Sequence, residues 1–183
     1  MIYIPLVSCK RIPDQDWLRL PEIFITKDPM TQIQTMLQWD RQTDETFTDQ
    51  KYSRAHTWQF DGGQLVRASA SPDIVRPPFS DPTAVDPEEA FVVSLSSCHM
   101  LWFLSIAASQ GWVVQSYQDA AVGEMTKNED GKLFVSQVTL RPNIQFSGEQ
   151  VPQPAEIVAM HEKAHSECFL ANSVKTKVVV DDG

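Results

Sequence analysis

Two of the three cysteines and three of the four histidines in this sequence lie in two segments where their types would suit redox or metal chemistry. Cys98 precedes His99, and Cys168 follows His161 and His165 in a later segment. Three interpretations compete for such a set. Buried thiols serve as small apolar core residues, thiols and imidazoles bind zinc, and a thiol pair can be oxidised to a sulfenic acid and then to a disulfide. No C-x-x-C spacing supports the zinc interpretation.

Cys98 lies in the middle of a strongly predicted helix, residues 86–110. Asp86 is a good N-cap, Pro87 suits the first helical position, and Glu89 completes a capping box. The segment is apolar on nearly every side and ends before Gly111. At about 37 Å it is longer than the core of a domain of this size. We therefore expect a partner chain to cover part of it.

Cys168 ends a second predicted helix, residues 155–168, which follows Pro154. Ile157, His161, Ala164 and Cys168 recur at spacings of four, three and four, so they share one face. A helix turns such a face toward its core. His99 is rotated by about 100° from Cys98 on its own helix, and we interpret all three histidines as packing or interface residues.

Composition restricts the classes of protein to consider. The chain has 183 residues, 42% of them apolar, and a net charge of −9, which predicts one domain and argues against nucleic acid as a partner. Three widely spaced cysteines do not form the framework of a secreted protein, so we expect a reducing, cytoplasmic location. Cys9, the third, is interpreted as a bystander.

Residues 90–108 carry no formal charge, a property they share with membrane spans. The segment contains four serines, begins beside Glu88 and Glu89, and lacks flanking basic residues, which is unlike a typical span. The N-terminus lacks a basic region and a long apolar run, so no signal peptide is predicted. We expect a core helix and no membrane partner.

The remaining elements predict an α+β fold. Residues 53–60 and 64–70 form a predicted hairpin around Asp61-Gly62-Gly63. Residues 113–125 and 133–146 read as two strands of an antiparallel meander, with a bend or sheet edge at Pro142, and residues 174–180 as a closing strand. Residues 1–50 are predicted as an N-terminal extension and residues 51–183 as the domain.

The motifs resemble those of the OsmC/Ohr family. Asp86-Pro87-Glu88-Glu89-Ala90, with Cys98 ten residues after Glu88, is similar to the family's first motif, and the run from Ala164 to Cys168 is similar to its second. The resemblance covers about residues 52–180. It implies an OsmC-like fold, in which antiparallel sheets pack on a long buried central helix and two chains form an intertwined homodimer.

The resemblance also implies a thiol peroxidase that reduces organic hydroperoxides to alcohols. In that scheme Cys98 is the peroxidatic thiolate, Cys168 resolves it as a disulfide, and Glu88 pairs with an arginine. Arg76 is the best placed arginine, with Arg54 and Arg67 as alternatives. No cofactor or metal is implied beyond an external dithiol reductant, such as a lipoyl protein or thioredoxin.

An arginine beside Cys98 would stabilise the thiolate, and a carboxylate would orient that arginine. An apolar wall of Phe91, Leu95, Trp102 and Phe103 is expected to favour lipid-like or aromatic hydroperoxides.

Glu88 and Cys98 are about 15 Å apart along a continuous helix. Either the helix breaks between them, or the glutamate that serves Cys98 comes from a second subunit. Two alternatives to a peroxidase remain, a non-catalytic ligand-binding or structural dimer and a zinc-thiolate protein.

Overall fold

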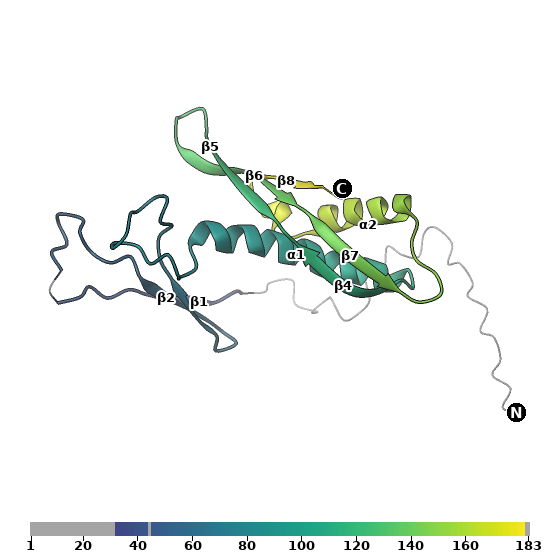
Figure 1. Ribbon diagram of the computed structural model, residues 1–183, viewed down its shortest axis with the longest axis horizontal. Coiled ribbons are helices and arrows are strands. Elements are labelled where there is room, and N and C mark those ends of the chain that lie inside the picture. The colour runs from purple at the N-terminus through teal and green to yellow at the C-terminus, as the bar shows by residue number, and fades with distance from the viewer. Residues whose placement is uncertain (1–31, 44, 182–183) are drawn as a thin grey trace, which may run out of the picture.

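The computed structural model describes residues 32–43 and 45–181, so Cys9 lies outside the described residues. The described residues form two α-helices, one 3₁₀ helix and eight strands (Figure 1). In order they are β1 Thr35–Gln38, β2 His56–Phe60, β3 Leu65–Ala68, α1 Pro87–Ser109, β4 Val113–Asp119, β5 Val122–Lys127, β6 Leu133–Leu140, β7 Pro142–Ser147, α2 Pro154–Glu167, η3 Ala171–Ser173 and β8 Lys177–Val180.

The helix α1 forms as predicted and runs without a break. The Asp86 side chain accepts a hydrogen bond from the Glu89 amide at 2.7 Å, and the Glu89 carboxylate accepts one from the Asp86 amide at 3.1 Å. Pro87 occupies the first turn, and Gly111 ends the helix with φ = 82°. The remaining elements assemble around this helix (Figure 1).

The two long strands predicted after α1 are each broken once. Residues 113–125 form β4 and β5, and residues 133–146 form β6 and β7, with Pro142 at the predicted bend. The pairing is antiparallel as predicted, but β4 pairs with β7 in one sheet and β5 with β6 in another. The prediction of two continuous strands is wrong. The two strands pair as one long ribbon, and this ribbon bends at the same level in both, between β4 and β5 and between β6 and β7.

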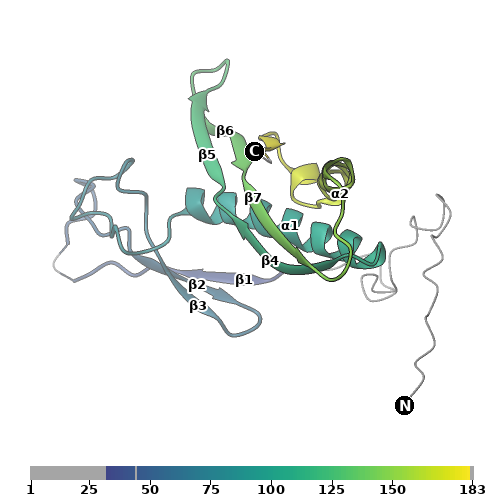
Figure 2. The same cartoon turned by 45° about the vertical axis from the view of Figure 1, so that its right-hand side comes forward.

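The second sheet is closed by β8, which lies parallel to β6, with Val178 opposite Val138. The ribbon crosses one side of α1, and α2 packs along its C-terminal half (Figure 2). The core has two clusters. The larger joins α1, α2, β4 and β7, and the smaller lies between the N-terminal half of α1 and the sheet of β5, β6 and β8.

Strands β1, β2 and β3 form a separate antiparallel sheet beside the N-terminal end of α1, away from α2 (Figures 1 and 2). The predicted hairpin of β2 and β3 is confirmed, and β1, from the segment predicted as an extension, pairs with β2. This sheet, which we call the arm, carries exposed apolar side chains: Met36, Leu37, Phe60 and Leu65.

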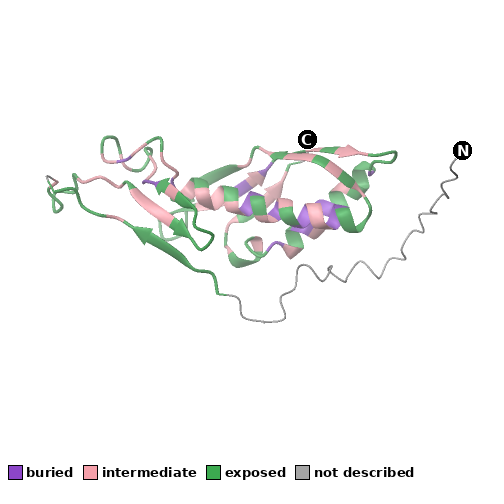
Figure 3. Cartoon of the chain, turned by 90° about the horizontal axis from the view of Figure 1, so that it is seen from below, coloured by how far each residue is buried: buried purple, intermediate pink, exposed green. Residues whose placement is uncertain are grey.

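Among the described helices, α1 alone has the length and apolar composition of a membrane span. In the fold it is instead the helix on which the sheets and α2 pack, and its buried residues form a stripe facing them (Figure 3). Some of its apolar side chains, including Val93 and Leu101, remain more than half exposed in the single chain.

Candidate active site

The two predicted thiols lie side by side at the junction of α1 and α2. Cys98 is half-buried in the middle of α1, and Cys168 is the C-cap of α2, 2% exposed in the larger core cluster. Both are free thiols, and Cys98 packs against the cluster that contains Cys168. The Ala171 amide of η3 donates a hydrogen bond of 3.4 Å to the Cys168 sulfur.

The two sulfur atoms are not equivalent. Burial raises the pKa of Cys168 to about 11, and a hydrogen bond with Cys98 raises it further. Cys168 is therefore a protonated thiol near neutral pH, and its S–H can be donated to the Cys98 sulfur.

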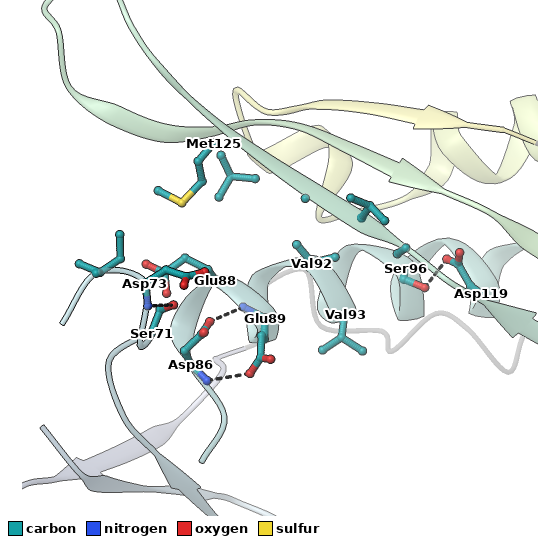
Figure 4. A pocket seen from close by; sticks show the side chains of 15 residues that line it. Ser71, Asp73, Asp86, Glu88, Glu89, Val92, Val93, Ser96, Asp119 and Met125 are labelled. Carbon is teal, nitrogen blue, oxygen red and sulfur yellow. Dashed lines mark hydrogen bonds between the residues drawn. The ribbon is translucent and has the colours of Figure 1, made fainter. Parts of the chain in front are cut away.

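Glu88 lies in a different place, a cavity of about 590 Å³ between the first turns of α1, the loop before it and strand β5. Figure 4 shows Glu88 and Asp73 near the first turn of α1 and Met125 opposite them. The cavity walls carry the acidic side chains Asp73, Asp86, Glu88, Glu89 and Asp119, and no lysine or arginine of the described chain lines it. The Glu88 Oε2 atom is buried without a hydrogen-bond partner among the described residues.

The geometry removes the first of the two possibilities for Glu88, a break in the helix. Because α1 is continuous from Pro87 to Ser109, Glu88 and Cys98 remain about 15 Å apart along it. Among the described residues, no lysine or arginine lines the cavity of Glu88, and no arginine hydrogen-bonds to Cys98.

The three candidate arginines differ in their surroundings. Arg76 is exposed in the loop before α1, and its guanidinium makes no hydrogen bond or ion pair in the described part of the chain. Arg67 forms an ion pair with Asp81. Arg54 donates hydrogen bonds to the carbonyl oxygens of Gln50 and Tyr52, at 2.7 and 2.5 Å.

Arg54 is also stacked on an aromatic ring. Its guanidinium carbon lies 3.9 Å from the centroid of the Tyr52 ring. None of the three guanidinium groups hydrogen-bonds to Cys98 or Glu88 within the described chain. The structure of one chain therefore does not select among them.

A buried histidine pair next to the thiols was not predicted. The Nε2 atom of His99 lies 3.0 Å from the Nδ1 atom of His161, and the two rings are nearly parallel, at 11°. Burial, with the nearby charges of His161 and His165, lowers the pKa of His99 to about 4. The sequence predicted that His161 lies on the same inward face of its helix as Cys168. Nothing in the sequence predicted that His99 lies opposite His161.

Residues 161–165 read His-Glu-Lys-Ala-His, the H-E-x-x-H order of some zinc-binding helices, which the sequence analysis missed. His161 directs Nδ1 into the core toward His99, while His165 is exposed. No group of three or more potential metal ligands occurs in residues 32–43 and 45–181. Among these residues the motif has no third ligand of the kind that a catalytic zinc site uses.

Three of the four residues predicted to form an apolar wall for the substrate are buried in the core. Leu95 belongs to the smaller core cluster, and Trp102 and Phe103 belong to the larger one, so all three are covered by their own chain. The described apolar residues that line the Glu88 cavity include Val92, Val93, Val122 and Met125.

Comparison with known proteins identifies the family. The family model for OsmC-like proteins matches residues 80–181, which include both thiols and Glu88. The chain belongs to the OsmC-like family. No protein of curated function matches the sequence.

Solved structures agree with this family. An OsmC-like protein of unknown function from Vibrio cholerae is 53% identical, with a TM-score of 0.81 over 83% of this chain and 99% of that one. An organic hydroperoxide resistance protein from Elizabethkingia anophelis shares 16% identity and a TM-score of 0.61 over 86% of this OsmC-like chain and 100% of that chain. OhrB of Bacillus subtilis, also an organic hydroperoxide resistance protein, has 16% identity and a TM-score of 0.57 over 82% and 98%. The last two show the shared fold.

Proposed function

We propose that this OsmC-like protein is a thiol peroxidase that reduces organic hydroperoxides to alcohols. The observation that carries the proposal is the contact of two free thiols, one half-buried on α1 and the other buried and protonated at the end of α2. Two such thiols satisfy the geometric need of a sulfenic acid and its resolving partner. The names of the hydroperoxide resistance proteins that share the fold point to the same chemistry.

The proposed reaction has two steps. The Cys98 thiolate attacks the hydroperoxide, the O–O bond breaks, and the alkoxide leaves and takes a proton to become the alcohol. Cys98 is then a sulfenic acid. The Cys168 thiol displaces its hydroxyl as water and forms the Cys98–Cys168 disulfide. An external dithiol, such as a lipoyl protein, returns both thiols by exchange.

The complete site is proposed to need a second copy of the chain. The arm and the outer face of α1 expose apolar side chains of matching character, including Leu37 and Leu65 on the arm and Val93 and Leu101 on α1. The unpartnered Glu88 Oε2 in an acidic cavity calls for a cationic group. A homodimer that lays one arm over the partner's α1 supplies both the cover and the cation.

The arginine in this scheme is Arg76, with Arg54 and Arg67 as the alternatives. Among the described residues, the Arg76 guanidinium has no hydrogen bond or ion pair within its own chain. It is therefore able to bind a carboxylate and a thiolate of the second chain without breaking an existing interaction. Comparing Arg76→Ala, Arg54→Ala and Arg67→Ala in rate of Cys98 oxidation selects the arginine. The variant that lowers the rate while leaving the melting temperature unchanged identifies it.

Single-turnover oxidation tests the function. Reduced protein is mixed with cumene hydroperoxide or t-butyl hydroperoxide, and intact mass is measured with time. A loss of about 2 Da, absent in Cys98→Ser and replaced by a gain of about 16 Da in Cys168→Ser, is the expected result. Absence of any mass change, with both thiols reactive only after denaturation, would instead support the non-catalytic dimer.

Proposed partners follow from the same chemistry and charge. The substrate is an organic hydroperoxide and the reductant a dithiol. The net charge of −9 disfavours nucleic acid. A reducing cytoplasm is the proposed location, because the catalytic cycle requires both thiols to be regenerated.

A further inference from the structure

We infer that the buried His99–His161 pair is a positioning device that sets the register of α2 on α1 and thereby holds Cys168 against Cys98. The inference rests on the proposed function in one respect: the register matters because it brings together the two thiols of the proposed reaction. His99 and His161 are positioning residues here and touch no substrate.

The positions of His99 and His161 on their helices are the first observation that supports the inference. His99 is the chain neighbour of Cys98 on α1, and His161 precedes Cys168 by seven residues, about two turns, on the same face of α2. The Nε2–Nδ1 contact of 3.0 Å therefore joins the two helices that carry the thiols. A slide of α2 by one residue along α1 would break this contact and move Cys168 away from Cys98.

The surroundings show why a polar contact matters there. The cluster between α1 and α2 contains Trp102, Phe103, Met160 and Ala164, whose packing is strong but not directional. A hydrogen bond tolerates only a narrow range of distance and angle. The pair thus supplies the direction that the apolar contacts lack.

The protonation pattern gives the bond a single orientation. The Nδ1 atom of His99 is buried without a partner among the described residues. A proton there would be an unpaired buried donor, so the ring proton of neutral His99 sits on Nε2 and is donated to Nδ1 of His161. The rings stack at 5.3 Å, and Phe103 packs on His161 at 4.4 Å between centroids, which fixes the planes of both imidazoles.

The test measures how strongly the protein favours its own disulfide. All proteins carry Cys9→Ser, and EDTA is present so that a metal bound by residues 161–165 does not contribute. Each protein is equilibrated with a mixture of reduced and oxidised dithiothreitol. As the Cys98–Cys168 bond forms, the oxidised dithiothreitol accepts two electrons and two protons and becomes the reduced form. The equilibrium constant reports the effective concentration of one thiol at the other.

Replacing both histidines by leucine keeps the interface apolar but removes the bond. We expect the constant for His99→Leu/His161→Leu to fall about fivefold, the ratio produced by one ordinary hydrogen bond. The rescue variant is His99→Gln/His161→Asn, in which the glutamine amide stands at the position of Nε2 and the asparagine oxygen at that of Nδ1. It is expected to recover most of the loss. The control His165→Gln, one turn beyond His161 and exposed, is expected to match the parent.

Two results would overturn the inference: a parental constant in the leucine pair, or an equal loss in His165→Gln. If the leucine pair does not fold, His99→Asn, whose amide is too short to reach His161, takes its place with the same expectation. The assay uses no peroxide. A parent that forms the disulfide but ignores hydroperoxides contradicts the proposed function alone, and a parental constant in the variants of an active peroxidase contradicts the positioning role alone.

Discussion

At the scale of the residue, the two thiols are made unequal by their surroundings. Cys168 is buried and donates to Cys98, whereas Cys98 remains half-exposed. The resemblance to the OsmC/Ohr family predicted that this pair would meet, and the structure places the two in contact. The histidine pair could not be predicted, because a helical face shows that His161 points inward without showing what it meets.

The inequality predicts an unusual titration of Cys168. In a Cys9→Ser/Cys98→Ala protein, Cys168 loses the sulfur that accepts its hydrogen bond but keeps its burial, which is the larger cause of the shift. We expect its pKa to lie below about 11 and still above its ordinary value of 9.0. Ultraviolet absorbance of the thiolate during a pH titration measures the pKa of Cys168. An ordinary value would show that water reaches this thiol more freely than its burial in the structure implies.

At the scale of the element, α1 is the part that local signals predict best. Its cap, its first-turn proline and its terminal glycine each act within a few residues, so the sequence contains the whole cause. The splitting of the long ribbon into β4, β5, β6 and β7 depends on how it bends over α1. No turn residue marks residues 120–121, and β1 has only four residues whose partner, β2, lies some twenty residues away.

The close approach of β5 to α1 gives a prediction about packing. A Cβ atom added to Gly123 would lie 2.5 Å from the Val92 Cγ2 atom, so Gly123→Ala forces the strand or Val92 to move. We expect a loss of about 1–3 kcal/mol in the free energy of unfolding, measured by urea denaturation. Gly62→Ala is the control, since nothing lies within 4 Å of the added atom. Val92→Ala should relieve much of the loss; if it does not, the contact is not its cause.

The His99–His161 contact predicts how the docking of α2 responds to acid. The pKa of His99 is 6.5 when unperturbed and about 4 in the fold. Between these values the unfolded chain binds more protons, so the free energy of unfolding falls as the pH drops from 6.5 toward 4. From about pH 7.5 to about pH 5 the loss attributable to His99 is about 2 kcal/mol.

The variant His99→Gln/His161→Asn tests that assignment. It is expected to lose less stability over the same pH interval than the parent, while His165→Gln follows the parent closely. Urea denaturation at both pH values gives the difference. An acid response that is identical in all three proteins would assign it to other groups.

At the scale of the whole molecule, three features of the single chain favour the proposed homodimer. Its thiols lie at the junction of α1 and α2, its unpaired glutamate lies near the start of α1, and its arm projects with apolar side chains exposed (Figure 1). The same expectation followed from the sequence, because the predicted apolar helix is longer than a domain of this size covers. The unbroken α1 strengthens the argument, because it removes the alternative in which Glu88 folds back on Cys98.

A mixing experiment decides whether Glu88 acts across the dimer. Glu88→Gln keeps Cys98 but lacks the carboxylate, and Cys98→Ser keeps the carboxylate but lacks the thiol, so each homodimer is expected to be slow or inactive with hydroperoxide. In a mixed dimer, one site combines the intact Cys98 of the first chain with the intact Glu88 of the second. After denaturation and refolding of an equal mixture, about a quarter of the parental sites should return, the statistical yield of a twofold assembly. If Glu88 acted within its own chain, no mixed site would contain both groups and the mixture would stay as slow as its parts, whereas recovery establishes that the site belongs to two chains.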